Sequence, residues 1–135
     1  MGYESRVVVM QQHLNKIFEV SDHIRYVAIY RNGKLISRVR PNIAHASDSA
    51  SDKYEELLVN PTILTLVSQR GNIDCGGSRF VVVRYGNFFQ FMMRIDGGHV
   101  SVCIDPEADV LTLSQQLYES ILSSTTIQAA AAIAL

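Results

Sequence analysis

Residues 25–40 read RYVAIYRNGKLISRVR, two β-prone runs on either side of Asn32-Gly33. Asparagine followed by glycine supplies the two positive φ angles of a type I′ turn, the connection that suits twisted antiparallel strands. The return run ends before Pro41, which cannot donate a hydrogen bond to a strand ladder. Apolar side chains occur on both faces of the first strand, so we expect helices on both sides of the sheet that contains it.

A second group of strands follows farther along the chain. Residues 79–85, 88–95 and 99–104 are rich in β-branched and aromatic side chains, and the separators Gly86-Asn87 and Asp96-Gly97-Gly98 divide them. Short separators that contain glycine join antiparallel neighbours. We therefore expect a three-stranded antiparallel meander with residues 79–85 as its outer strand.

Two helical segments precede this meander. Apolar residues at three- and four-residue steps predict a helix over residues 6–20. Ser51 offers an N-cap for a second helix. Asn60-Pro61 is expected to kink or divide that helix, because proline is tolerated in a first helical turn and not in an interior. The second segment should stop before Gly71.

The last helix has a start signal of its own. Asp105-Pro106-Glu107 places an acidic cap, then proline at the first helical position, then more negative charge in the first turn. Leu113 and Leu117 lie at helical spacing after it and predict the buried face.

The order of elements, α-ββ-α-βββ-α, predicts an α+β fold: a five-stranded antiparallel sheet with helices on both faces. At 135 residues the chain is long enough for one domain with a substantial core, and we place this domain at residues 1–124. Residues 125–135 form an alanine-rich C-terminal tail without a polar face, and no functional role is assigned to it.

Composition argues against several functional classes. The net charge of -1 gives no general attraction for nucleic acid or anionic membranes. No apolar run reaches the roughly 18 residues that span a bilayer, and the N-terminus lacks the apolar core of a signal peptide. Cys75 and Cys103 have neither metal-site spacing nor the number needed for a disulfide scaffold. We expect a cytoplasmic protein with reduced thiols that binds no nucleic acid and inserts into no membrane.

Side chains suited to catalysis form no recognisable motif. His13, His23, His45 and His99 are scattered along the chain, and none lies in an HExxH, CxxC or GxSxG context. The paired acids Glu55-Glu56 fall early in a helix, where the helix dipole favours negative charge. We therefore expect a non-enzymatic protein without catalytic, cofactor-binding or metal-binding residues.

Arginine is the most abundant charged residue in the predicted strands. Strand alternation places Arg38 and Arg40 on one face, pointing away from Val39. One interpretation is a basic patch for an acidic partner, an anionic ligand or RNA. The other is that these side chains lie along the sheet margin and pair with acidic residues of the same chain. The absence of an RNP-type motif argues against RNA.

Large apolar side chains occur on both faces of residues 88–93, FFQFMM. A strand of this composition needs cover on both sides. Most of these side chains are expected in the core, and a second copy of the protein or a small ligand in a sensor-type cavity would supply the remaining cover.

The chain resembles the roadblock/dynein light chain family, which is related to the longin and profilin folds. The resemblance rests on Ser21-Asp22-His23 after the first helix, the hairpin at 27–36, the meander at 79–104 and the terminal helix from Pro106. It covers residues 7–123. The break at Asn60-Pro61 departs from the continuous second helix that is common in the family.

This resemblance implies a dimeric interaction or scaffold module that regulates a small Ras-like GTPase. Family members pair through the second helix and a neighbouring edge strand, so that one sheet runs through the dimer. Carried onto this chain, the implied interface residues are Leu57, Leu64, Val67, Arg79, Val81 and Val83. The alternative is a ligand-sensing domain of PAS or GAF type, which predicts an internal cavity lined by Tyr26, Phe89 or Phe91.

Overall fold

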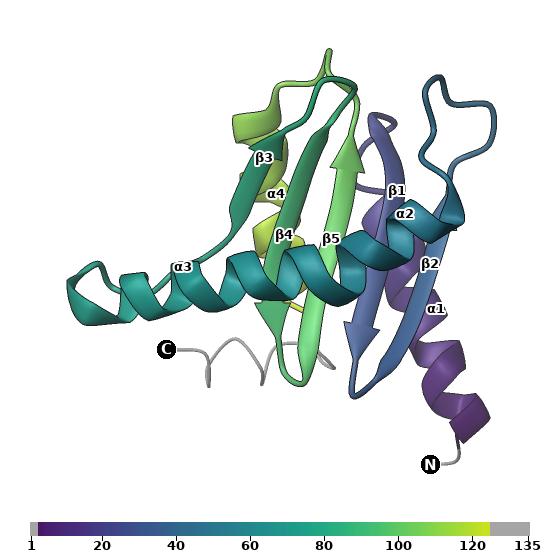
Figure 1. Ribbon diagram of the computed structural model, residues 1–135. Helices are drawn as coiled ribbons and strands as arrows, with labels where there is room; N and C mark the ends of the chain where they lie inside the picture. The colour runs from purple at the N-terminus through teal and green to yellow at the C-terminus, as the bar shows by residue number, and fades with distance from the viewer. Residues whose placement is uncertain (1–2, 125–135) are drawn as a thin grey trace.

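The computed structural model describes residues 3–124, with side chains described from residue 8 onward (Figure 1). Its elements follow the predicted order. They are α1 (Tyr3–Phe18), β1 (Ile24–Arg31), β2 (Lys34–Val39), α2 (Ser49–Tyr54), the π-helical turn η1 (Glu55–Val59), α3 (Asn60–Asp74), β3 (Val81–Arg84), β4 (Phe89–Ile95), β5 (Gly98–Ile104) and α4 (Val110–Leu122). The alanine-rich tail predicted at residues 125–135 lies outside the described residues.

The strands form one five-stranded sheet in the order β2-β1-β5-β4-β3, with every neighbouring pair antiparallel. Helices α1 and α4 lie behind the sheet in Figure 1, and α2, η1 and α3 cross its front. The predicted α+β class, with helices on both faces, is confirmed. Because β1 and β5 are central, both of their faces are buried, as the apolar residues on both sides of the first strand indicated.

The hairpin between β1 and β2 has the predicted turn. Asn32 and Gly33 have φ angles of 52° and 80°, and Arg31 pairs with Lys34 across the turn. Two consecutive positive φ angles are the requirement of a type I′ turn.

Replacing Gly33 by valine is expected to lower the free energy of unfolding by about 1 kcal/mol or more, because a β-branched residue is strained at positive φ. No atom lies within 4 Å of the position where a Cβ would stand, so the expected loss comes from the backbone conformation alone. A urea unfolding curve checks the change, and an unchanged midpoint would contradict the turn assignment.

The main hydrophobic core lies between the sheet and the helices α1 and α4. Leu14 and Ile17 contribute from α1, and Leu117 from α4 is 0% exposed. These side chains pack on the inward residues of the four longer strands and of β3, among them Val27, Ile29, Phe91, Met93, Val100 and Val102. Most of the apolar burial of the domain is therefore on this one face of the sheet.

The second helix differs from its sequence prediction at three points. It begins at Ser49, because Asp48 and not Ser51 is the N-cap: the Asp48 carboxylate accepts a hydrogen bond from the Ser51 amide at 2.8 Å. No break occurs at Asn60-Pro61, where Asn60 keeps helical angles. The Asn60 amide instead donates to the Glu55 carbonyl, five residues back, and this widened turn places Pro61 in the first turn of α3.

The expected stop before Gly71 was also wrong, because α3 continues to Asp74. Gly71 is instead a point of close packing. A Cβ atom there would lie 3.0 Å from the Gly77 carbonyl carbon and from the Ser78 amide nitrogen. The glycine thus lets the returning chain pass close to the helix.

The cap of α4 is Asp109 and not Asp105. The Asp109 carboxylate accepts from the Thr112 amide at 3.3 Å and from the Thr112 hydroxyl at 2.8 Å. Asp105 is occupied elsewhere, since it accepts from the guanidinium of the buried Arg25 at 3.3 Å. The helix therefore begins one turn later than the sequence signal indicated.

Candidate functional site

The face of the sheet that carries α2, η1 and α3 is built differently from the main core. Its fully buried side chains include polar groups from the central strands, notably His99 and Ser101 of β5 and Gln90 of β4. The apolar cluster on this side is small and contains Tyr26, Ala28 and Cys103. Polar contacts therefore contribute much of what joins the long helix to the sheet.

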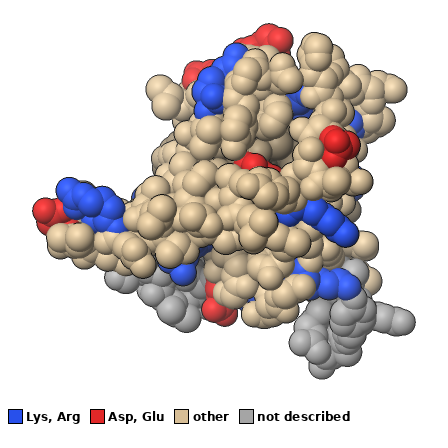
Figure 2. Space-filling model, in the orientation of Figure 1, with Lys and Arg blue, Asp and Glu red and all other residues tan. Residues whose placement is uncertain are grey.

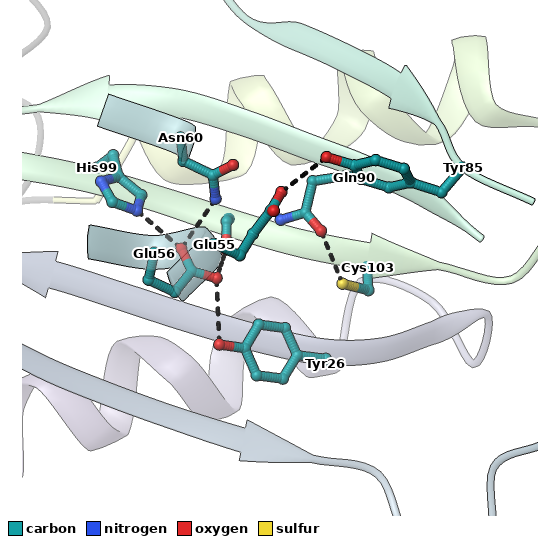
Figure 3. Close-up of polar contacts among 9 residues, drawn as sticks. Tyr26, Glu55, Glu56, Asn60, Tyr85, Gln90, His99 and Cys103 are labelled. Atoms are coloured by element: carbon teal, nitrogen blue, oxygen red, sulfur yellow. Dashed lines mark hydrogen bonds and ion pairs between the residues drawn. The ribbon is translucent and has the colours of Figure 1, made fainter. Parts of the chain in front are cut away.

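Glu56 of η1 is at the centre of these contacts and is 0% exposed (Figure 3). Its carboxylate is contacted by four side chains. They are Tyr26 Oη at 3.1 Å, Asn60 Nδ2 at 3.0 Å, His99 Nε2 at 2.8 Å and Ser101 Oγ at 2.6 Å. A carboxylate buried from water is tolerated only when such groups replace its hydration.

Two different parts of the fold provide these four groups. Asn60 is one helical turn after Glu56, whereas Tyr26 comes from β1 and His99 and Ser101 come from β5. Burial and the nearby Glu56 carboxylate together raise the pKa of Tyr26, so its hydroxyl stays protonated and remains a donor. The network fixes the rotation of the helix about its own axis relative to the sheet.

Burial along the helix follows steps of four and three residues. The buried positions are Glu56, Asn60, Leu64, Ser68 and Gly71. Such spacing places them on one face, and that face is mostly polar or small. The large apolar side chains consequently point outward, which is the reverse of an ordinary amphipathic helix.

The outward face of the helix exposes a series of apolar residues. Leu66 is 61% exposed and Ile73 is 75% exposed. Figure 1 shows that α3 extends beyond β3, past the edge of the sheet, and Figure 2 shows that this side of the helix is mostly uncharged. We define the outer helix face by its exposed apolar residues, Tyr54, Leu57, Leu58, Leu66, Val67 and Ile73.

Strand β3 is the edge of the sheet next to this projecting helix. It is shorter than predicted, covering Val81–Arg84 and not residues 79–85. The Tyr85 amide donates to the Phe88 carbonyl. In an antiparallel pair every second residue bonds to the neighbouring strand, so Val81 and Val83 direct their backbone groups toward β4. The backbone N–H and C=O groups of Val82 and Arg84 therefore point away from β4. These groups have no strand beside them within the described chain.

The structure places the six residues predicted for the interface in different environments. Leu57 and Val67 lie on the outer helix face, and Val81 and Val83 are half-buried in the edge strand. Arg79 is exposed just before β3 and donates to the Gly76 carbonyl at 3.2 Å. Leu64, by contrast, is only 4% exposed and packs inside the protomer, so its side chain is not available to a partner.

The two arginines of the candidate partner patch have contacts inside the chain. The Arg38 guanidinium lies 4.4 Å from the centre of the Phe18 ring and donates to Asn15 of α1. The Arg40 guanidinium lies 5.3 Å from the centre of the same ring and donates to the Ile24 carbonyl at 2.6 Å. Both arginines thus lie at the sheet margin, as the second interpretation expected. The pairing with acidic residues that it also expected is wrong for the described residues, because their partners are the Phe18 ring, Asn15 and backbone carbonyls.

The residues expected to line a sensor cavity do not share one. Phe91 is fully buried in the main core, where its ring centre lies 5.4 Å from that of Phe80, and Phe89 packs on the same core. Tyr26 belongs to the opposite face of the sheet, where it lines an open hollow of about 290 Å³ that contains neither Phe89 nor Phe91. The space around Phe91 is therefore filled by other side chains of the protein.

Neither metal ligands nor a membrane span stand out in the structure. Among the side chains of residues 8–124, no group of three or more His, Cys, Asp or Glu is placed to hold a metal ion. In the same range, none of the helices has the length and apolar character needed to cross a membrane. Cys75 is exposed and Cys103 is buried, and both thiols are free.

The Glu56 network was missed in the sequence, where Glu55-Glu56 was attributed to the helix dipole. One signal was present. His99 and Ser101 alternate with valines inside a strand that the order of elements makes central, and polar groups at such positions need buried partners.

The fold is similar to those of several solved structures. The Roadblock/LC7 domain from Streptomyces avermitilis matches with a TM-score of 0.58 and 19% identity, over 82% of this chain and 92% of that one. MglB with a tetrameric arrangement matches with a TM-score of 0.65 and 10% identity, over 100% and 95%. MglC from Myxococcus xanthus matches with a TM-score of 0.52 and 12% identity, over 82% and 91%.

No protein-family model and no curated protein matches the sequence. The structural matches agree with the resemblance drawn from Ser21-Asp22-His23, the Asn32-Gly33 hairpin, the meander and the terminal helix. This chain has the roadblock fold.

Proposed function

We propose that the protein is a non-enzymatic, homodimeric interaction module that acts with a small Ras-like GTPase. The observation that carries the dimer is the projection of α3, with exposed apolar residues, beyond an edge strand whose outward backbone groups are unpaired within the described residues. An uncovered edge of β-branched residues is prone to pair with another strand. A second copy placed about a two-fold axis supplies that strand.

The geometry makes the two contacts mutually supporting. If β3 pairs with β3 of a second copy, the sheet continues past its present edge. The projecting part of α3 then lies beside the α3 helix of the partner, and pairing of the two outer helix faces removes Leu66, Val67 and Ile73 from water. The tetrameric arrangement of the similarly folded MglB supports self-association of this kind.

Leu66→Glu and Arg84→Pro test the two contacts separately. Leu66 is 61% exposed, so a charge there leaves the protomer intact and opposes apolar pairing. Proline at position 84 removes an outward-facing amide and no bond of the β3–β4 ladder. We expect the unaltered protein to sediment at twice its 15.1 kDa at micromolar concentration. Each variant is expected to sediment as a monomer.

Leu111→Glu is the matched control. Leu111 is an 82% exposed apolar residue of α4, on the opposite side of the sheet. The same substitution there should leave the dimer intact, while circular dichroism reports folding of all three variants. A mass of 15.1 kDa for the unaltered protein would refute the dimer. Retention of the dimer in both interface variants would refute this interface.

The GTPase partner rests on the resemblance to the roadblock family and on the fold. Affinity capture from the native cell, followed by mass spectrometry, tests it with the unaltered protein as bait. We expect enrichment of a small Ras-like GTPase over a bait of unrelated fold. Equal recovery on both baits would contradict this part of the proposal and leave the dimer unaffected.

A further inference from the structure

A hollow of about 290 Å³ opens between the start of the long helix and the turn that joins β3 to β4. Asp52, Glu55 and Glu56 line it from the helix, and Tyr85, Phe88 and Gln90 line it from the strands and their turn. Figure 2 shows acidic atoms within a recess above the helix. The volume is close to the lower limit of small-molecule sites, about 300 Å³.

The carboxylates of Asp52 and Glu55 have no cationic partner among the side chains of residues 8–124. Asp52 makes no ion pair, and Glu55 accepts only a hydrogen bond from the Tyr85 hydroxyl, at 3.1 Å. The Arg25 guanidinium, which lies 5.9 Å from the centre of the Phe88 ring, is bound by Asp105 and by the Ala44 carbonyl. Burial first, and then the neighbouring carboxylates, raise the pKa of both Asp52 and Glu55. Glu56 is paired with His99, so Asp52 and Glu55 are the carboxylates of the hollow that have no ion pair within the described residues.

Aromatic rings form the wall opposite these carboxylates. The ring centres of Tyr85 and Phe88 are 5.5 Å apart, and the two planes are tilted by 57°. Aromatic faces attract cations, most strongly where water is partly excluded. Carboxylates on one wall and rings on the other suit an organic cation better than a hydrated metal ion.

Gln90 provides an independent indication of a ligand at the floor of the hollow. Its side chain is 1% exposed, and its Oε1 accepts a hydrogen bond from the Cys103 thiol at 3.0 Å. The Nε2 of the same amide is buried without an acceptor. Figure 3 shows Gln90 between Glu55 and Cys103, and all three residues line the hollow. A buried donor in this position calls for an acceptor oxygen from outside the chain.

We propose that this hollow binds a guanidinium or ammonium group that carries a carbonyl oxygen nearby. Asp52 and Glu55 bind the cation, the rings of Tyr85 and Phe88 flank it, and Gln90 Nε2 donates to the carbonyl. Two sources present this chemistry: a free amino-acid derivative, and an arginine or lysine residue within a peptide. The residues of the hollow differ from those of the proposed dimer interface, so the two proposals stand or fall separately.

Three related cations test the proposal by titration followed with NMR chemical shifts, in about 0.15 M salt to screen general charge attraction. L-argininamide carries the cation and the carbonyl, and agmatine is the same molecule without the carboxamide. N-acetyl-L-argininamide resembles a residue within a peptide. We expect saturable binding of L-argininamide, with shifts centred on residues 85–88, and weaker binding of agmatine. Equal binding of the acetylated compound would identify a residue within a peptide as the ligand. Absence of binding by the acetylated compound would identify a free amino-acid derivative.

Single substitutions test separately the residues that bind the cation and the residue that binds the carbonyl. Asp52→Asn and Glu55→Gln are each expected to weaken L-argininamide binding by about fivefold, the effect of a partly screened ion pair. Asp22→Asn, which removes an exposed carboxylate from the turn before β1, is the control for net charge and should leave binding unchanged. Gln90→Leu is expected to reduce the affinity for L-argininamide to that for agmatine. Melting curves confirm that each variant is folded.

Three results would overturn the proposal. One is the absence of saturable binding by all three cations. Another is equal weakening by Asp22→Asn and Asp52→Asn, which would mean general charge attraction. The third is a preference for L-argininamide over agmatine that survives in Gln90→Leu, which would remove the assigned role of the orphan amide.

Discussion

Replacing Glu56 by glutamine should destabilise the protein by about 3–5 kcal/mol, the loss seen when one partner of a buried charged network is removed. The Glu56 carboxylate is fully buried and is contacted by Tyr26, Asn60, His99 and Ser101. An amide has one acceptor oxygen in place of two, and its NH2 group takes the place either of the oxygen that binds Asn60 and His99 or of the oxygen that binds Tyr26 and Ser101. At least one buried donor is then left without an acceptor.

Urea unfolding measures this loss, with an expected fall of the midpoint of about 1–3 M. Glu107→Gln, an exposed glutamate before α4, makes the same chemical change and should leave the midpoint unchanged. Ser101→Ala removes only one of the four contacts to Glu56 and should cost about 1 kcal/mol. Equal midpoints for Glu56→Gln and Glu107→Gln would show that the network contributes nothing to stability.

The network also connects stability to the proposed assembly. Glu56 determines which side of the helix faces the sheet, and therefore which residues are presented outward. A variant that keeps the fold but rotates the helix would turn Leu66 and Ile73 away from their present positions. Loss of dimer in a folded Glu56 variant would thus follow from the geometry, even though Glu56 itself is buried.

The strands could be predicted from the sequence because their signals are local. Asn32-Gly33 requires only the conformations of two residues, and Gly86-Asn87 and Asp96-Gly97-Gly98 limit the meander in the same way. Local signals of this kind do not depend on the rest of the fold. The order within the hairpin and within the meander then follows from connectivity. The non-local pairing of β1 with β5, which leaves β3 at the edge of the sheet, does not.

Helix starts were less predictable because more than one nearby residue can cap. Asp48 and Ser51 are both suitable, as are Asp105 and Asp109, and local sequence does not decide between them. In the fold, Asp105 is bound by Arg25, which lies 80 positions earlier in the chain, so Asp109 is left to cap α4. The tertiary contact between Arg25 and Asp105 therefore determines which aspartate caps α4.

The face of the second helix could not be inferred from its apolar residues. The usual assumption buries leucines and exposes acids, whereas this helix buries Glu56 and Asn60 and exposes Leu66. The donors that permit this arrangement lie 30 and 45 positions away from Glu56, in β1 and β5. The widened turn at Glu55–Val59 also shifts the register of every later residue. The erroneous placement of Leu64 on the surface has the same origin.

Replacing Leu117 by alanine is expected to cost about 2–5 kcal/mol, because the deletion leaves a cavity in the main core. Leu117 is 0% exposed and packs among residues of α1 and the sheet. Asp109→Ala removes the observed cap of the same helix and should cost about 1 kcal/mol. Thermal and urea unfolding of both variants should therefore place Leu117→Ala well below Asp109→Ala. If Asp109→Ala were the more destabilising change, α4 would depend mainly on its N-cap and would contribute little to the core. The packing of α4 on the sheet described above would then be wrong.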